Sequence, residues 1–509
     1  MPESTIVLKS DPGIKRDGTK YEGNAYVDGQ WVRWQRGLPR KIGGFRAATE
    51  FLPDISRGIT NINQGGFVYV HSGSPNALSK FTIDVNYNSS SIQDRTPTTL
   101  VNNAANKWMF DYQYDSSTSA NSILAHVAPN NSYTTNDLGG QFFYGDAFGN
   151  AALTEIAAPA GANFAGGIVS LHPYLFYYGA NGVIGWSMPG DFTDLTGAGS
   201  GVARVWGAKI IKGMPLRAGS GTAPAGLFWA YDAIIRASFT GGATIFQFDI
   251  IATETSIISP DSVVDYDGIF FWCGVDRFLM FNGVVREVPN LMNSNYFFDG
   301  INQQQRQKVF GFKVPRFGEI WWCYPKGDAT ECTHAIIYNV REQSWYDTEL
   351  PNGGRSSGTY SNLFTAPLLP GIDTSAPTNY HVWIHEKGVD EIYGSTVLPI
   401  ESYFETGDLS SLPQGQSQWV RVSMIEPDFV QVGDMTVQVT GRTNARSPEV
   451  YGTTFTFPDV ADAPYQQVVM TKEQRRELRF KFSSNAINGD YQMGQIIVHT
   501  EIGDKTVIG

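Results

Sequence analysis

The chain is poor in cysteine, and the few cysteines that it has do not form a pattern. Cys273, Cys323 and Cys332 are the three cysteines among 509 residues. An odd, sparse set cannot supply the disulfide framework of a small secreted domain, and none of these spacings matches a zinc site. We therefore expect buried, reduced thiols in a protein that is made in a cytoplasm.

Long apolar runs are missing as well. Among the longest is the run at residues 269–273, far below the roughly 20 residues that cross a bilayer as a helix. The first ten residues, MPESTIVLKS, lack the basic and apolar regions of a signal peptide. The sequence thus predicts no membrane segment and no secretion signal.

Residue patterns typical of catalysis or cofactor binding are also scarce. His381 and His385 are spaced as in a metalloprotease helix, but Glu does not follow the first histidine, and the segment favours a strand. The glycines at residues 197–201 are not followed by the Lys-Ser or Lys-Thr of a phosphate-binding loop. No Gly-x-Ser-x-Gly segment precedes a predicted helix. We expect no catalytic, metal-binding or cofactor-binding residues, and a protein that is not an enzyme.

Aromatic residues and glycine, in contrast, are abundant. Aromatics make up 13% of the chain, hydrophobic residues 42%, and 54 glycines are spread along its whole length. Many short strands joined by tight turns produce this distribution. The sequence therefore predicts an all-β protein.

A recurring hairpin pattern indicates how these strands are organised. The clearest example is residues 267–283, where two β-rich runs flank a polar turn and Asn282-Gly283 supplies a further hairpin turn. Similar units begin near residues 67, 141, 174, 227, 319 and 380, about 50 residues apart on average. This spacing is typical of four-stranded propeller blades. We favour six blades, with seven as the alternative count.

Both ends of the chain fall outside this repeat. Residues 1–60 contain a strand-like segment and turn-rich stretches, and they are interpreted as an arm that docks to a partner or donates a strand. Residues 61–408 form the predicted propeller. From residue 409 to 509, alternating apolar positions such as Val437 and Val439 predict half-buried antiparallel strands and a small C-terminal β domain.

The charge is unevenly distributed. The net charge is −12, but residues 15–46 carry eight basic and three acidic side chains, which leaves −17 for the rest. Because DNA binding without sequence preference depends on Lys and Arg at the phosphates, the acidic part cannot hold DNA in that way. The basic segment either meets an acidic partner or is an ordinary solvated strand with local ion pairs.

Three stretches together resemble the tail hub or nozzle proteins of short-tailed bacteriophages, which are also called packaged-DNA stabilisation proteins. Residues 31–45 (WVRWQRGLPRKIGGF) resemble their amino-terminal motif, and residues 185–191 (GWSMPGD) resemble their Trp-Ser turn. Residues 267–283 and 335–345 are similar to their blade segments. The resemblance covers about residues 1–400.

The resemblance implies a non-enzymatic virion protein of the phage tail, made in the host cytoplasm. Six copies would form a ring below the portal and adaptor, continue the DNA channel, retain the packaged genome and connect to fibres or a spike. An acidic lumen would let DNA pass without binding. Docking to the adaptor would then use the basic segment through Arg33, Arg36, Arg40 and Lys41. Reversal of these four charges is expected to abolish ring attachment while the propeller stays folded.

Two flexible segments are candidates for a gate in such a channel. One is the loop with Gly197, Gly199 and Gly201, and the other is residues 356–365. Loops rich in glycine and serine are commonly mobile.

Two rival functions remain open. A tail adhesin or a glycan-binding or glycan-cleaving propeller would use exposed aromatics and a carboxylate pair at the mouth of the propeller. Glu401 with Glu405, or Asp191 with Asp194, could supply such a pair if about 5–10 Å separates the carboxyl groups. A soluble intracellular propeller scaffold is the third interpretation, and it predicts a monomer.

Overall fold

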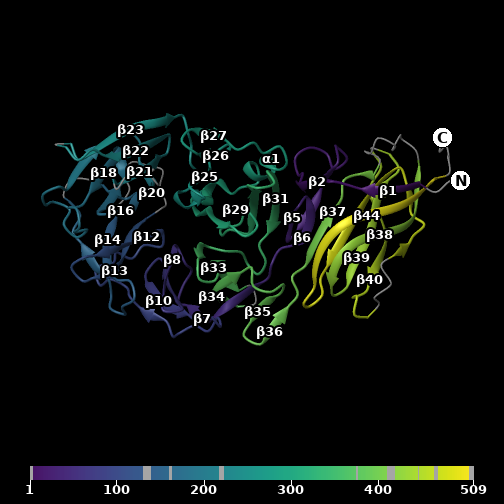
Figure 1. Ribbon diagram of the computed structural model, residues 1–509, viewed down its shortest axis with the longest axis horizontal. Helices are drawn as coiled ribbons and strands as arrows, with labels where there is room; N and C mark the ends of the chain where they lie inside the picture. Colours follow the sequence, from purple (N-terminus) through teal and green to yellow (C-terminus); the bar gives the residue numbers. More distant parts are fainter. Residues whose placement is uncertain are drawn as a thin grey trace.

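The computed structural model describes residues 4–129, 139–159, 163–216, 223–242, 244–373, 376–409, 419–444, 446–462 and 468–503. Two β units lie side by side (Figure 1). One is a ring of small sheets, and the other is a pair of larger sheets built from the first and last strands of the chain.

The ring is a β-propeller, and in its first six blades the strand order follows the chain. Blade 1 contains β8 (Ile59–Gln64), β9 (Phe67–Gly73), β10 (Leu78–Ile83) and β11 (Gln93–Asp94). Blade 2 contains β12 (Asn106–Asp115), β13 (Ala120–Pro129), β14 (Gln141–Asp146) and β15 (Thr154–Ile156). Blade 3 contains β16 (Gly167–Leu171), β17 (Tyr174–Tyr178), β18 (Val183–Trp186) and β19 (Gly201–Arg204).

The next three blades repeat this plan. Blade 4 contains β20 (Ile210–Pro215), β21 (Ala225–Ala230), β22 (Ala233–Phe239) and β23 (Phe246–Thr253). Blade 5 contains β24 (Val264–Tyr266), β25 (Ile269–Cys273), β26 (Phe278–Phe281) and β27 (Val285–Glu287). Blade 6 contains β28 (Phe310–Val314), β29 (Glu319–Tyr324), β30 (His334–Asn339) and β31 (Ser344–Glu349).

Blade 7 closes the ring with a strand from the other end of the chain. Its sheet has the order β32 (Thr359–Ser361), β33 (Ala366–Asp373), β34 (Ala376–His385), β7 (Phe45–Leu52), β35 (Glu391–Tyr393) and β36 (Thr396–Leu398). Strand β7 is antiparallel to β34 and parallel to β35. Around most of the ring, the first strands of neighbouring blades contact one another. Between blades 4 and 6, the short 3-10 helix η2 (Pro260–Ser262) contacts the first strand of each.

The propeller prediction is confirmed, but the favoured count of six blades is wrong, because the structure has seven. The hairpin segments predicted in blades 1–6 pair as expected. The seventh predicted unit does not pair with itself, since β7 lies between β34 and β35. A count based on consecutive hairpins cannot find a blade whose strand comes from more than 300 residues away in the chain.

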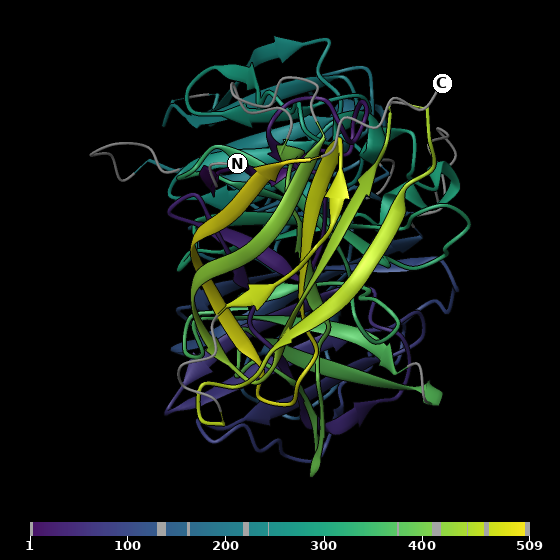
Figure 2. The same cartoon turned by 90° about the vertical axis from the view of Figure 1, so that its right-hand side faces the viewer.

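The second unit is a sandwich of two sheets drawn from both ends of the chain. One sheet has the order β41 (Val469–Met470), β38 (Val420–Val432), β44 (Asp490–Ile502), β6 (Leu38–Lys41) and β5 (Val32–Gln35). In the same sheet β1 (Ser4–Leu8) pairs with β44, and β42 (Gln474–Arg475) pairs with β38. The other sheet has the order β4 (Asp28–Gln30), β37 (Ser402–Glu405), β43 (Glu477–Ser484), β39 (Met435–Arg442) and β40 (Val450–Phe457). Figure 2 shows these long strands in front of the propeller.

Strand pairing groups the chain differently from a division at residues 60 and 408. Strands β1, β4, β5 and β6 belong to the sandwich, whereas β7 belongs to the propeller. A further pair, β2 (Asp11–Ile14) and β3 (Ala25–Tyr26), is parallel. The alternation predicted beyond residue 409 is seen in the sandwich, where Val437, Val439, Phe480 and Phe482 are buried.

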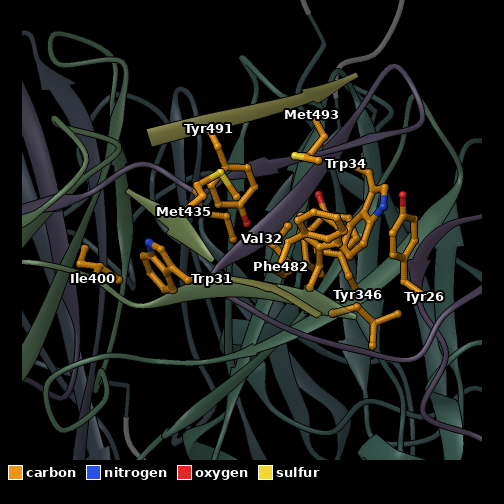
Figure 3. Close-up of a cluster of buried hydrophobic side chains, with 14 of the residues drawn as sticks. Tyr26, Trp31, Val32, Trp34, Tyr346, Ile400, Met435, Phe482, Tyr491 and Met493 are labelled. Carbon is orange, nitrogen blue, oxygen red and sulfur yellow. The ribbon is translucent and has the colours of Figure 1, made fainter. Parts of the chain in front are cut away.

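One continuous hydrophobic core joins the sandwich to the propeller. It includes Trp31 and Trp34 from the sandwich side, and Trp321 and Tyr346 from blade 6. Figure 3 shows part of this cluster, where Trp34 and Tyr346 lie at Phe482 and Trp31 lies beside Ile400. Each of the two tryptophans is at most 1% exposed. Because both units contribute to the same core, they form a single packed body.

Helical structure in the described residues is limited to short segments. Residues 293–307 contain α1 (Ser294–Phe298) and overlap the 3-10 helix η3 (Gln303–Lys308). Besides η2 and η3, the described residues contain one more 3-10 helix, η1 (Ala180–Gly182). In the described part of the chain, no helix has the length and apolar character needed to span a membrane.

Candidate functional site

A cavity of about 540 Å³ lies at the centre of the propeller. Its lining comes from all seven blades and includes the first strand of most of them, for example Thr60 of β8, Asp111 of β12, Ser170 of β16 and Lys212 of β20. This arrangement is the one expected when the innermost strand of each blade faces the axis. The axis is therefore open and polar over part of its length.

Opposite charges alternate along this axis. The Nζ of Lys107 lies 2.8 Å from Oδ2 of Asp261, and the Nζ of Lys212 lies 3.9 Å from Oδ1 of the same carboxylate. Burial alone would raise the pKa of Asp261, but the two ammonium groups lower it. Burial lowers the pKa of Lys212 and raises that of Asp111. Asp261 therefore stays ionised between two lysines.

A second cavity, of about 360 Å³, forms a mouth at one end of the axis. It shares Asp261 and Ser357 with the central cavity. Much of its lining comes from the segments that lead into the first strands of blades 1, 2, 6 and 7, so these residues lie at one face of the propeller. Three cations, Arg57, Lys107 and Lys308, line it together with one carboxylate.

Arg33, the first of the four predicted docking residues, is buried at the joint between the two units. Its Nε lies 2.9 Å from Oε1 of Glu319 in blade 6, and its Nη1 donates to Oε2 of Glu386 at 2.9 Å. Tyr346 and Trp321 donate to the same Glu319 carboxylate, at 2.6 Å and 2.9 Å. Burial alone would lower the pKa of Arg33, but the two carboxylates raise it. The guanidinium therefore stays charged and is held inside the chain by two carboxylates.

The other three predicted docking residues differ in exposure. Lys41 is 2% exposed, its Nζ donates to the carbonyl of Gly489 at 2.7 Å, and burial lowers its pKa. Arg40 is partly buried and donates to Gln35 at 2.9 Å. Arg36 is exposed. Arg33 and Lys41 are thus not available to a partner, whereas Arg36 and part of Arg40 face solvent.

The predicted gate glycines lie at the outer edge of blade 3. Gly201 begins β19, the strand of that blade farthest from the axis. The backbone N–H of Gly197 donates to Asp194 at 2.7 Å, and the indole of Trp186 donates to the carbonyl of Gly199 at 3.1 Å. The loop is therefore tied to its own blade and lies away from the axial cavity. Of the second candidate segment, residues 356–365, Ser357 and Gly358 line the axial cavity.

The paired carboxylates proposed from the sequence have structural partners. Asp191 and Asp194 accept backbone N–H groups of the turns that follow them, at 2.9 Å from Thr193 and Thr196 respectively. Glu405 is buried, and its Oε1 lies 3.1 Å from Nε of Arg479, whereas Glu401 is exposed.

His385 accepts a hydrogen bond from Arg355 at 3.1 Å, and burial lowers its pKa.

Several residues that define the axis and the joint were not found from the sequence. Lys107, Asp261, Glu319 and Glu386 are single charges on different blades, and pairing across the fold brings them together. One signal was present: Arg33 stands between Val32 and Trp34 in an otherwise apolar run. A charge inside such a run predicts a buried ion pair, because an unpaired buried charge is very costly.

Comparisons with known proteins assign the chain to no family. No protein-family model and no curated protein matches the chain. Among solved structures, the WD40 β-propeller domain of Doa1 aligns over 67% of this chain and 97% of its own, with 12% identity and a TM-score of 0.39. A structure described as YCF48 bound to D1 peptide aligns over the same shares, with 10% identity and a TM-score of 0.38.

Proposed function

We propose that this chain is a structural subunit of a bacteriophage tail. Six copies would form a nozzle or hub ring below the portal and adaptor, continue the DNA channel, retain the packaged genome and connect to fibres or a spike. One observation carries the proposal: residues 31–45, one of the stretches that together resemble such proteins, build the joint between sandwich and propeller. A joint packed in this way suits a ring subunit that bears the pressure of packaged DNA.

The joint is suited to this load. Arg33 of the sandwich is paired with Glu319 of blade 6 and with Glu386, which follows β34 of blade 7. Beside it, the backbone N–H of Trp31 donates to Oγ1 of Thr348 at 2.9 Å, and Trp31 packs against Trp321. Trp31 has a φ of +51°, at the point where the chain passes from β4 in one sheet to β5 in the other. The joint thus combines charge, hydrogen bonds and apolar packing.

The net charge also suits passage of DNA. Each chain carries −12, so six copies would carry about −72. Carboxylates that face a lumen repel phosphates, and DNA would then pass without being held. Docking to an acidic adaptor would use Arg36 and Arg40, the two of the four predicted docking residues that face solvent at least in part.

Electron microscopy of the purified protein, alone and mixed with the portal–adaptor complex of its phage, tests the proposal. We expect six-membered rings, and loss of ring attachment in Arg36→Glu/Arg40→Glu with an unchanged melting temperature. The matched control is Arg286→Glu, an exposed arginine on the outer strand of blade 5. The four-residue reversal is unsuitable, since a carboxylate at position 33 would face Glu319 and Glu386. Monomers in both preparations would overturn the proposal.

A further inference from the structure

The mouth of the propeller concentrates positive charge on an otherwise acidic chain. Arg57 forms two hydrogen bonds with Glu331, at 2.8 Å and 2.9 Å, and Lys308 contacts the same carboxylate at 2.8 Å. Lys107 and Lys212 share Asp261 in a similar way. Three of these cations line the mouth, whereas Lys212 lies in the central cavity, where it also interacts with Asp111. At the mouth, Arg57, Lys107 and Lys308 therefore outnumber Glu331 and Asp261 by one charge.

The mouth also presents the side-chain amides of three glutamines. Gln304, Gln305 and Gln307, all from η3, line the cavity. Within the described residues, the side-chain amides of these glutamines form no hydrogen bond with the chain. Each amide offers two donors and one acceptor oxygen in a plane. Such groups complement hydroxyl groups, which both donate and accept.

Aromatic rings are missing from the described lining of the mouth, which consists of charged, amide, serine and alanine side chains. Binding of a neutral sugar by stacking on an aromatic face, which a glycan-binding propeller would use, therefore has no basis here. The attraction for a ligand therefore has to come from the cations, and the selectivity for a sugar has to come from hydrogen bonds between the amides and its hydroxyl groups. The cavity of about 360 Å³ lies near the lower end of the roughly 300–1,000 Å³ typical of small-molecule sites.

We propose that the mouth binds a carboxylated sugar, as one unit of an acidic polysaccharide. Its carboxylate would lie near Lys308 and Arg57, which are joined through Glu331 and therefore act together. Its hydroxyl groups would meet the free amides of Gln304 and Gln307. An acidic peptide would use the cations equally well, and its backbone can also pair with amides, but a sugar ring presents several adjacent hydroxyl groups to the three neighbouring glutamines. The site is independent of ring formation, so either proposal can fail without the other.

Titration calorimetry on the full-length protein tests the site. The probe is a trimer of galacturonic acid, compared with a neutral galactose trimer and with triglutamate. We expect binding of the sugar acid that weakens as salt rises, and binding at least tenfold weaker for the other two. Gln304→Ala/Gln307→Ala should weaken binding of the sugar acid about tenfold, and Lys308→Gln should do the same.

Gln303→Ala is the matched control, because Gln303 lies in the same 3-10 helix, is exposed, and does not line the cavity. Thermal unfolding of each variant checks that it is folded. Absence of binding to the sugar acid, or unchanged binding in both site variants, would overturn the proposal. Equal affinity for triglutamate would also overturn it, in favour of an acidic peptide. Equal affinity for the neutral trimer would show that the cations play no part.

Discussion

The propeller and the sandwich are both built of antiparallel strands, but their contacts span very different distances along the chain. In blades 1–6 every strand pairs with its neighbour in sequence. In the sandwich, Ser4 pairs with Thr500 and Asp28 pairs with Glu405. One unit is therefore a series of local hairpins, and the other is complete only when both ends of the chain are present.

This difference bears on folding and on stability. Local hairpins close short loops, so we expect the blades to form before the long-range pairing of the sandwich. Two elements connect the early and late parts: β7 completes blade 7, and the core around Trp31 and Trp34 is shared. We infer that the sandwich locks a ring that is already largely formed.

The largest effect is expected from a change at the joint. Arg33→Met leaves Glu319 buried without its cation, and breaking a buried pair in this way costs about 3–5 kcal/mol. Urea unfolding followed by tryptophan fluorescence should show one transition shifted to lower urea, because both units share a core. Arg36→Met, at an exposed position three residues away, should change stability by at most about 0.5 kcal/mol. Two separate transitions in the wild type would contradict a shared core.

A smaller effect is expected from acid, and it should originate in the propeller. Burial lowers the pKa of His126 in blade 2 to about 4, from an ordinary value near 6.5. Because the unfolded chain binds the proton more tightly, stability is lost as the pH falls from about 6.5 to 4, by about 3 kcal/mol for this residue. His126→Gln should reduce the difference in unfolding free energy between pH 7 and pH 4 by that amount.

The control for this measurement is His172→Gln, at an exposed histidine of blade 3. It should leave the difference between the two pH values unchanged. An equal effect of both substitutions would mean that burial of His126 is not the cause. Hydrogen exchange at pH 4 should then locate the first opening amides, which we expect in blades 1, 2 and 7, where His71, His126 and His385 are buried.

The smallest effect is expected at the surface of the joint. Glu342, between β30 and β31 of blade 6, accepts the backbone N–H groups of Arg36 and of Gly37, the latter at 3.1 Å. Glu342→Ala removes these bonds from partly exposed groups and should cost about 1 kcal/mol in urea unfolding. Glu287→Ala, on the outer strand of blade 5, is the control and should have almost no effect. A loss above about 3 kcal/mol for Glu342→Ala would mean that the joint depends on this surface contact.

The sequence by itself determined the class of the fold and most of its local pieces. Runs such as Ile269–Cys273, the Asn282-Gly283 turn and the alternation at Val437 and Val439 each depend on neighbouring residues, so local pattern was sufficient. Only the tertiary structure decided how many blades there are. Strand β7, from the N-terminal part of the chain, completes blade 7 by pairing with β34 near residue 380. The tertiary structure also decided that Arg33 is buried, and which charges meet at the axis. Pairing over hundreds of residues depends on packing, and packing leaves no period in the sequence.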